Sequence, residues 1–174
     1  MYRIMIVDDE EQILRALGRI LKRNGEWEFE TYSRPDDALK RIQTTPFDLI
    51  LSDYRMPGMN GVEFLTEVKK FQPDSARLIL SGQADLGGLL GAINEAEIFR
   101  FIDKPWDDYD LITTMKQALV HRDMVLTNRM LADQVRQQQA SIDLQRKELE
   151  RLEASSPGLT KVNWGPNGEI ILEE

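Results

Sequence analysis

Short apolar runs alternate with amphipathic segments through the first 120 residues. An apolar run without polar alternation is typical of a strand buried on both faces of a parallel sheet. Such runs occupy residues 4–7, 49–53, 77–80 and 98–102. Residues 27–32 alternate between apolar and polar, which predicts a more exposed strand. Five strand-then-helix units predict an α/β fold with a five-stranded, doubly wound parallel sheet and helices on both faces.

The segments between these strands carry apolar residues at helical spacing. Residues 12–24 and 62–71 are predicted helices, and Ser33 is predicted to cap a third helix with Pro35 in its first turn. Gly87, Gly88 and Gly91 interrupt the fourth predicted helix. Each interior glycine costs about 1 kcal/mol relative to alanine. We therefore expect this helix to be marginally stable and able to move.

A long helix without proline or glycine is predicted from Trp106 to Ala154. Its heptads favour a parallel coiled-coil dimer over residues 121–154, with Asn128 fixing the register. A single solvated helix is the alternative, because Gln138 and Gln145 weaken the apolar seam. The a positions are His121, Asn128, Val135, Ile142 and Leu149, and the d positions are Met124, Leu131, Gln138, Gln145 and Leu152.

The C-terminal residues 155–174 carry the signal of a β-hairpin. Residues 161–164 and 169–172 are strand-like and flank Gly165-Pro166-Asn167-Gly168. An isolated two-stranded hairpin is marginal in water, so we expect it to pack on its twin in a dimer, on the long helix or on a domain absent from this sequence. In the last case the tail is the start of a truncated output module. The predicted division is a domain at 1–120, a coiled coil at 121–154 and a hairpin tail at 155–174.

Composition narrows the classes of function. The formal net charge of −8, with no basic patch, argues against direct binding of nucleic acid. The absence of cysteine excludes disulfides, thiolate zinc sites and cysteine nucleophiles. The absence of cysteine also fits a reducing cytoplasm, where we expect the protein to reside. No apolar run reaches membrane-spanning length, so we expect no membrane partner. The single histidine, His121, is interpreted as a helix residue.

Carboxylates follow two of the predicted buried strands. Asp8 and Asp9 follow the first strand, and Asp53 ends the third. A single aspartate at a strand end can simply cap the next helix. Two charges about 4 Å apart, however, repel by roughly 4 kcal/mol at an effective dielectric of about 20, so three clustered carboxylates need a cation or raised pKa values. Oxygen ligands without nearby histidine or cysteine favour Mg²⁺.

Two further polar side chains follow the fourth and fifth strands. Ser81 alone is typical of a turn, and Lys104 alone is typical of a surface. In a doubly wound sheet both should face the carboxylates at the same edge. Acids, a metal ion, a hydroxyl and an ammonium group together indicate an oxyanion or phosphoryl site.

The ordered set of motifs resembles the receiver domain of two-component response regulators over residues 1–120. The set comprises Asp8-Asp9, Asp53, Met56-Pro57-Gly58-Met59-Asn60-Gly61, Ser81-Gly82 and Lys104-Pro105. The resemblance implies a flavodoxin-like receiver fold. It also implies that Asp53 accepts a phosphoryl group from a sensor histidine kinase or phosphotransfer protein, so the chain acts as a switch and not as an enzyme on other substrates.

The resemblance also assigns roles around the phosphoacceptor. Mg²⁺ would be held by Asp9, Asp53 and the backbone carbonyl of Arg55, with Asp8 assisting through water. Ser81 would donate to a phosphoryl oxygen, and Lys104 would pair with another. Phe101 stands at the position of the switch aromatic, so Ser81 and Phe101 are the predicted switch residues.

Two other functions remain open from the residues alone. A metal-dependent phosphatase that forms an aspartyl phosphate is one alternative, although such enzymes usually carry a second acid soon after the nucleophile. Here Tyr54 and Arg55 follow Asp53. The other alternative is a scaffold or adaptor whose helix and hairpin bind a partner without any phosphorylation.

Overall fold

Five strands within residues 2–104 form one parallel sheet. Its strand order is β2-β1-β3-β4-β5, and all neighbouring pairs are parallel. This arrangement confirms the predicted flavodoxin-like receiver fold. The strands are β1 (Tyr2–Val7), β2 (Trp27–Tyr32), β3 (Leu49–Asp53), β4 (Ala76–Gly82) and β5 (Arg100–Lys104).

The computed structural model describes residues 1–82 and 96–158, together with the backbone of 163–164 and 170–171. The predicted helix that contains Gly87, Gly88 and Gly91 lies outside the described residues. The chain forms two compact units, Met1–Leu126 and Thr127–Glu174, each with most of its residue contacts inside the unit.

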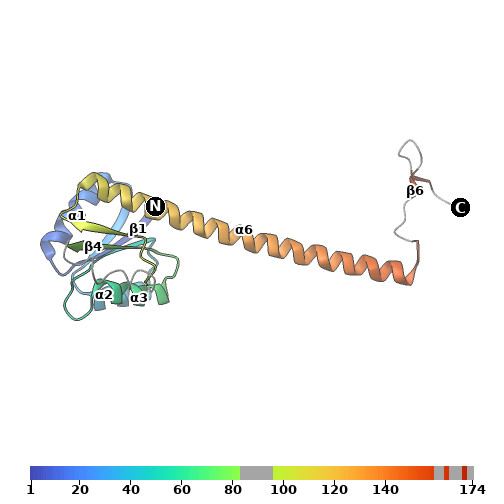
Figure 1. Ribbon diagram of the computed structural model, residues 1–174, viewed down its shortest axis with the longest axis horizontal. Coiled ribbons are helices and arrows are strands. Elements are labelled where there is room, and N and C mark those ends of the chain that lie inside the picture. Colours follow the sequence, from blue (N-terminus) through green and yellow to red (C-terminus); the bar gives the residue numbers. More distant parts are fainter. Residues whose placement is uncertain (83–95, 159–162, 165–169, 172–174) are drawn as a thin grey trace. The chain divides into compact units, whose positions relative to one another are not determined.

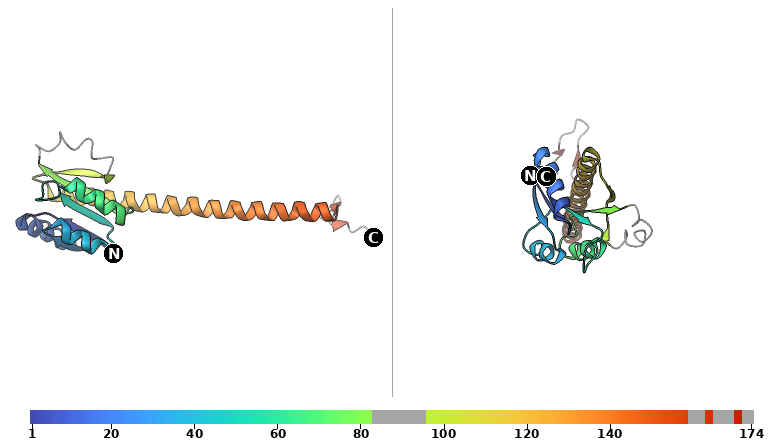
Figure 2. Two further views of the ribbon diagram at one scale, coloured as in Figure 1. Left: turned by 90° about the horizontal axis from the view of Figure 1, so that it is seen from below. Right: turned by 90° about the vertical axis from the view of Figure 1, so that its left-hand side faces the viewer.

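Helices pack on both faces of the sheet (Figures 1 and 2). Side chains alternate along β1 between the two cores, so Ile4 and Ile6 join one cluster while Met5 and Val7 join the other. The first cluster includes residues of α1 (Glu11–Asn24) and α6 (Asp108–Ser155), and the second includes residues of α2 (Pro35–Ile42) and α3 (Gly61–Phe71). Burial on both faces explains why the central strands are continuous apolar runs.

Strand β5 begins later than its apolar pattern predicts. Arg100 is the first residue of the strand and pairs with Leu78, whereas Ile98 was predicted to begin it. Ile98 is buried in the second core, so its apolar character reflects packing without strand pairing. The N–H of Phe99 donates to the carbonyl of Arg77 at 2.8 Å, just before the strand begins.

Two helix starts also differ from the sequence prediction. The N-cap of α2 is Arg34 in an extended conformation without a side-chain cap, so the prediction that Ser33 caps this helix is wrong. Helix α6 begins at Asp108 instead of Trp106. The Asp107 carboxylate accepts the N–H groups of Tyr109 and Asp110 at 2.8 and 3.0 Å, and this cap fixes the start.

Helix α6 changes character along its length. Its first turns bury Leu111, Met115 and Leu119 against the sheet. The apolar residues at later heptad positions, such as Val135 and Ile142, are exposed in this single chain. The coiled coil therefore stays a prediction.

No helix in the described part of the chain combines the length and apolar character that a membrane crossing needs.

Strands β6 (Asn163–Trp164) and β7 (Ile170–Ile171) pair antiparallel, as the hairpin pattern predicts. Their residues Asn163 and Trp164 face Ile171 and Ile170 in the register. That this tail begins an output module stays a prediction.

A polar network ties α6 to the amino end of the sheet. Arg122 pairs with Asp48, at the start of β3, over 2.9 Å and donates from Nε to the carbonyl of Asp74 at 2.9 Å. The neighbouring Asp123 accepts the hydroxyl of Tyr2 at 2.5 Å. The Arg122 side chain is only 19% exposed, so solvent screens this pair less than a surface pair.

Substitution Arg122→Gln is expected to lower the free energy of unfolding by about 2 kcal/mol, because it leaves the half-buried Asp48 without its charged partner. Arg15→Gln is the matched control, since its pair with Glu11 is exposed on both sides. That variant should stay within about 0.5 kcal/mol of the parent. Urea unfolding measures both, and equal values for the two variants would contradict the importance of the Arg122 network.

Candidate functional site

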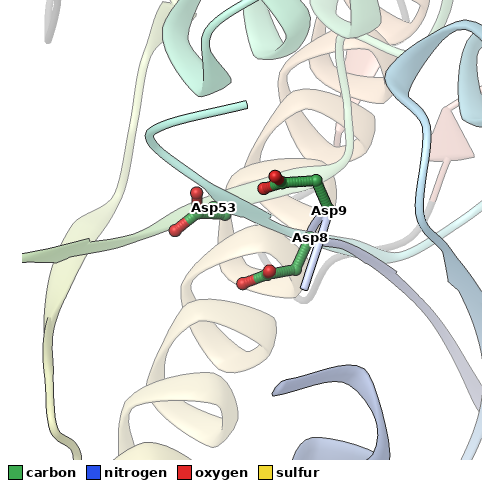
Figure 3. Close-up of side chains that lie close together, drawn as sticks. All are labelled: Asp8, Asp9 and Asp53. Atoms are coloured by element: carbon green, nitrogen blue, oxygen red, sulfur yellow. The ribbon is translucent and has the colours of Figure 1, made fainter. Parts of the chain in front are cut away.

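The carboxylates predicted to cluster do meet at one edge of the sheet. Strands β1 and β3 are neighbours, with Val7 opposite Ser52, so the residues that follow them lie side by side. Carboxylate oxygens of Asp8, Asp9 and Asp53 all lie within 4.8 Å of one another (Figure 3). Asp8 is fully buried and Asp53 is 6% exposed, whereas Asp9 is exposed.

Lys104 reaches this cluster from β5. Its Nζ lies 2.6 Å from Oδ1 of Asp53 and 2.9 Å from Oδ2 of Asp8. Strand β4 separates β5 from β3 in the sheet, so the long lysine side chain is needed to span that distance. The predicted meeting of the ammonium group with the acids is therefore confirmed in geometry, while the roles of these residues stay predictions.

Burial and charge act in opposite directions at this cluster. Burial raises the pKa of Asp8, and the hydrogen bonds from Lys104 and from the N–H of Glu10 oppose that rise. Burial alone would lower the pKa of Lys104, but hydrogen bonds and charges from Asp53 and Asp8 outweigh it, so the pKa is raised. Lys104 therefore remains a cation at neutral pH and offsets part of the negative charge.

Ser81 is placed beside the cluster by β4. The residue is 1% exposed, and its register partner on β5 is Asp103, directly before Lys104. Its Oγ has no hydrogen-bond partner within the residues that the structure describes. A buried hydroxyl without a partner is costly, so such a group favours a ligand oxygen that accepts a hydrogen bond from it.

The other predicted site residues lie near the acids with less defined contacts. The N–H of Arg55 donates to Oδ2 of Asp53 at 2.8 Å, which orients the carboxylate. The role of the Arg55 carbonyl as a metal ligand stays a prediction. Phe101 is partly buried against the second core cluster and lies opposite Ile79 in the register. Its role in switching also stays a prediction.

Gly61, which follows the loop after Asp53, belongs to the motif quoted above, but sequence reasoning missed its positioning role. Asn60 caps α3 through a capping box with Glu63, and Gly61 is the first residue of the helix. A Cβ atom at Gly61 would lie 2.1 Å from the backbone oxygen of Asp53. Only glycine lets α3 begin this close to the end of β3. A glycine directly after an N-cap, where other residues are better helix formers, was the available signal.

Substitution Gly61→Ala is expected to lower the free energy of unfolding by about 1–3 kcal/mol, because the backbone around Asp53 must move. Gly18→Ala in α1 is the control, since its Cβ would lie at an ordinary 3.5 Å from Phe29. Alanine is the better helix former by about 1 kcal/mol, so this variant should be as stable as the parent or more stable. Urea unfolding distinguishes the two, and similar losses in both would refute the steric argument.

The donor set at this edge suits Mg²⁺. Oxygen atoms of three carboxylates lie close together, and no histidine or cysteine takes part in the cluster. Hard oxygen donors in small number match an ion that keeps several of its waters. Asp8, Asp9 and Asp53 are therefore the residues that would hold it.

The family assignment follows from a comparison with known protein families. Residues 4–116 match the response regulator receiver domain. The chain belongs to this family. Its members act as phospho-accepting switches that work with histidine kinases or phosphotransfer proteins in two-component signalling.

Individual relatives support the same assignment. The receiver is 40% identical over 116 residues to the hydrogenase transcriptional regulatory protein HoxA of Cupriavidus necator, covering 67% of this chain and 24% of that protein. It is 30% identical to the DNA-binding transcriptional regulator NtrC of Klebsiella pneumoniae, over 67% of this chain and 24% of that protein. A solved response regulator receiver domain protein from Clostridium thermocellum has a TM-score of 0.66 and 28% identity, covering 72% of this chain and 99% of that chain.

The chain spans about a quarter of the length of the curated relatives it matches. NtrC is named as a DNA-binding regulator, so the relatives give no support to the expectation that this protein does not bind nucleic acid. The family match ends at residue 116 and does not include the predicted heptads at 121–154.

Proposed function

We propose that Asp53 of this receiver accepts a phosphoryl group from the phosphohistidine of a sensor kinase or phosphotransfer protein, in a reaction that requires Mg²⁺. The observation that carries this proposal is the position of Lys104, whose Nζ contacts both Asp53 and Asp8 at 2.6 and 2.9 Å. An ammonium group beside an acid cluster is the arrangement that phosphoryl transfer to a carboxylate needs.

In the proposed step, an Asp53 carboxylate oxygen attacks phosphorus while the phosphorus–nitrogen bond to the donor imidazole breaks. The electron pair of that bond stays on the imidazole nitrogen, and the product on this chain is an aspartyl phosphate. The N–H of Arg55 holds one carboxylate oxygen at 2.8 Å and so fixes the orientation of the nucleophile. A bound Mg²⁺ would neutralise negative charge on the carboxylates and on the transferring group.

Lys104 and Ser81 stabilise the product in this proposal. The ammonium group of Lys104 already contacts Asp53, so it can move to an oxygen of the new phosphoryl group. The hydroxyl of Ser81, which lacks a partner among the residues described, would donate to another oxygen. Movement of Ser81 toward that oxygen would open space for Phe101, which lies on the neighbouring strand opposite Ile79, two residues before Ser81.

We also infer that the chain forms a parallel homodimer through heptads 121–154. Apolar side chains at the a and d positions, including Val135, Ile142 and Leu149, are exposed in the single chain. A helix that exposes a regular apolar seam gains stability by covering it with a second copy. The dimer would carry the state of the receiver along the helix to an output.

Incubation with acetyl phosphate and Mg²⁺, followed by intact-mass measurement, tests the phosphoacceptor proposal. Addition of a single phosphoryl group is the expected result, and chelation of Mg²⁺ should prevent it. A protein that stays unmodified in Mg²⁺ with both acetyl phosphate and a phosphohistidine donor would refute the proposal.

A further inference from the structure

A groove of about 590 Å³ is lined by residues of α1 and β2, and none of the three clustered acids lines it. Leu14 and Phe29 form its apolar part. Gly18 keeps the groove open, because a Cβ at this position would already lie 3.5 Å from the ring of Phe29, and a longer side chain would extend over that ring. Both elements are drawn in blue in Figure 2. The groove thus offers an apolar anchor point at the side of the sheet.

Three exposed cations line the same groove. Arg15, Arg19 and Lys22 follow each other at helical spacing on α1, so they share one face. Arg15 pairs with Glu11 in an exposed contact at 2.5 Å, which holds it only weakly. Across residues 1–82 and 96–158, neither Arg19 nor Lys22 forms an ion pair. The sequence predicted no basic patch, but α1 presents these cations together on one face of a protein whose net charge is −8. This local positive surface favours an anionic partner.

Among the described residues, no strand pairs with the outer edge of β2, which borders the groove. Strand β2 is the outermost strand of the sheet, and its carbonyl at Tyr32 accepts the N–H of Asp8 at 3.1 Å. In a parallel ladder alternate residues direct both backbone groups to the same neighbour, so Tyr32 points toward β1 while Phe29 and Thr31 point outward. The backbone groups of Phe29 and Thr31 are therefore placed to pair with another strand.

We propose that this groove binds an extended acidic segment of a partner protein, which adds to the sheet as a strand beside β2. Backbone pairing with Phe29 and Thr31 supplies affinity, and an apolar side chain of the segment packs on the ring of Phe29. Carboxylates of the segment face Arg19 and Lys22. An acidic segment fits better than a basic or neutral one because the unpaired charges that line the groove are positive.

Binding at this groove uses none of the phosphoacceptor residues, so it goes beyond the proposed phosphotransfer and does not rest on it. The test uses the full chain and a fluorescein-labelled peptide in which glutamates flank a central isoleucine at alternate positions, with threonine between them. Fluorescence anisotropy should show saturable binding that weakens as salt is raised, because exposed charges are screened. The same peptide with lysine in place of glutamate should not bind.

Two variants separate the backbone contact from the charge contact. Thr31→Pro removes an edge N–H without changing any charge, and proline is tolerated on the free side of an edge strand. The double variant Arg19→Glu and Lys22→Glu reverses the charges that line the groove. Each should weaken peptide binding at least tenfold, whereas Lys40→Glu, an exposed charge reversal on α2, should leave the affinity unchanged.

The outcomes are distinct. Unchanged affinity in the double variant, or no saturation with the acidic peptide, overturns the proposal. A change in oligomeric state on Thr31→Pro without a change in peptide affinity also overturns it, because the edge would then pair copies of this chain. Circular dichroism checks the fold of Thr31→Pro, and if that variant does not fold the charge variants decide the question.

Discussion

An Asp53→Asn protein is expected to keep its unmodified mass in acetyl phosphate and Mg²⁺ while the parent protein gains one phosphoryl group. The loss should be complete, because asparagine carries an amide in place of the nucleophilic carboxylate that forms the acyl phosphate. Asparagine has nearly the same shape, and Asp53 is 6% exposed, so the substitution tests chemistry more than packing. Intact-mass measurement over time gives the fraction of modified protein for both.

Asp103→Asn is the matched control for this experiment. Asp103 is an exposed acid on β5 directly before Lys104, and it lies opposite Ser81 in the register. Removing its charge changes the same edge of the sheet without removing a proposed nucleophile. The control should be modified like the parent protein. Modification of Asp53→Asn at the rate of the parent would place the phosphoryl group elsewhere and refute the assignment of Asp53.

The two-sided burial of the sheet explains why its central strands were predictable. Residues 4–7 of β1 and 49–51 of β3 contact a core on each face, so these positions require apolar side chains and the sequence pattern is unambiguous. Ile98 breaks this relation, because it is buried in a core without belonging to a strand. Apolar periodicity reports burial, and only backbone pairing decides where a strand begins.

The composition of the site was predictable, including that Lys104 faces the acids, whereas the individual contacts were not. The carboxyl ends of parallel strands meet at one edge, so Asp8 and Asp53 were expected to be neighbours. The contact of one ammonium group with both acids depends on the reach of Lys104 across β4, which no sequence pattern encodes. The approach of α3 to the backbone of Asp53 at Gly61 likewise appears only in three dimensions.

Contacts between distant segments explain what else the sequence did not reveal. Arg122 lies on a helical pattern that reads as solvated surface, yet it pairs with Asp48 at the opposite end of β3 from the site. A charged residue with a partner 74 positions away carries no local signal. The same limit applies to the groove at β2, since the free edge follows from the strand order and not from the strand itself.

Substitution Ile142→Lys is expected to raise the dissociation constant of the proposed dimer at least about 100-fold. Ile142 is at an a position and is 54% exposed in the single chain, so a parallel dimer would bury it against its counterpart. Loss of about 1.5–3 kcal/mol of burial from each copy, with two ammonium groups placed opposite each other, exceeds the roughly 2.8 kcal/mol that corresponds to a 100-fold change. Sedimentation equilibrium measures the monomer–dimer ratio.

Leu144→Lys is the matched control. It distinguishes loss of an apolar side chain from the a/d seam from a general increase in the polarity of the helix. Leu144 stands two positions later, at a c position, and is 69% exposed, so the same substitution on the same turn should leave the dimer intact. Lysine is a good helix former, so neither substitution should destabilise a single helix. Equal weakening by the two substitutions would mean that the helix associates without a heptad register. A parent protein that remains monomeric at all concentrations would favour the single solvated helix, and the state of the receiver would then need a route to its output other than a dimeric rod.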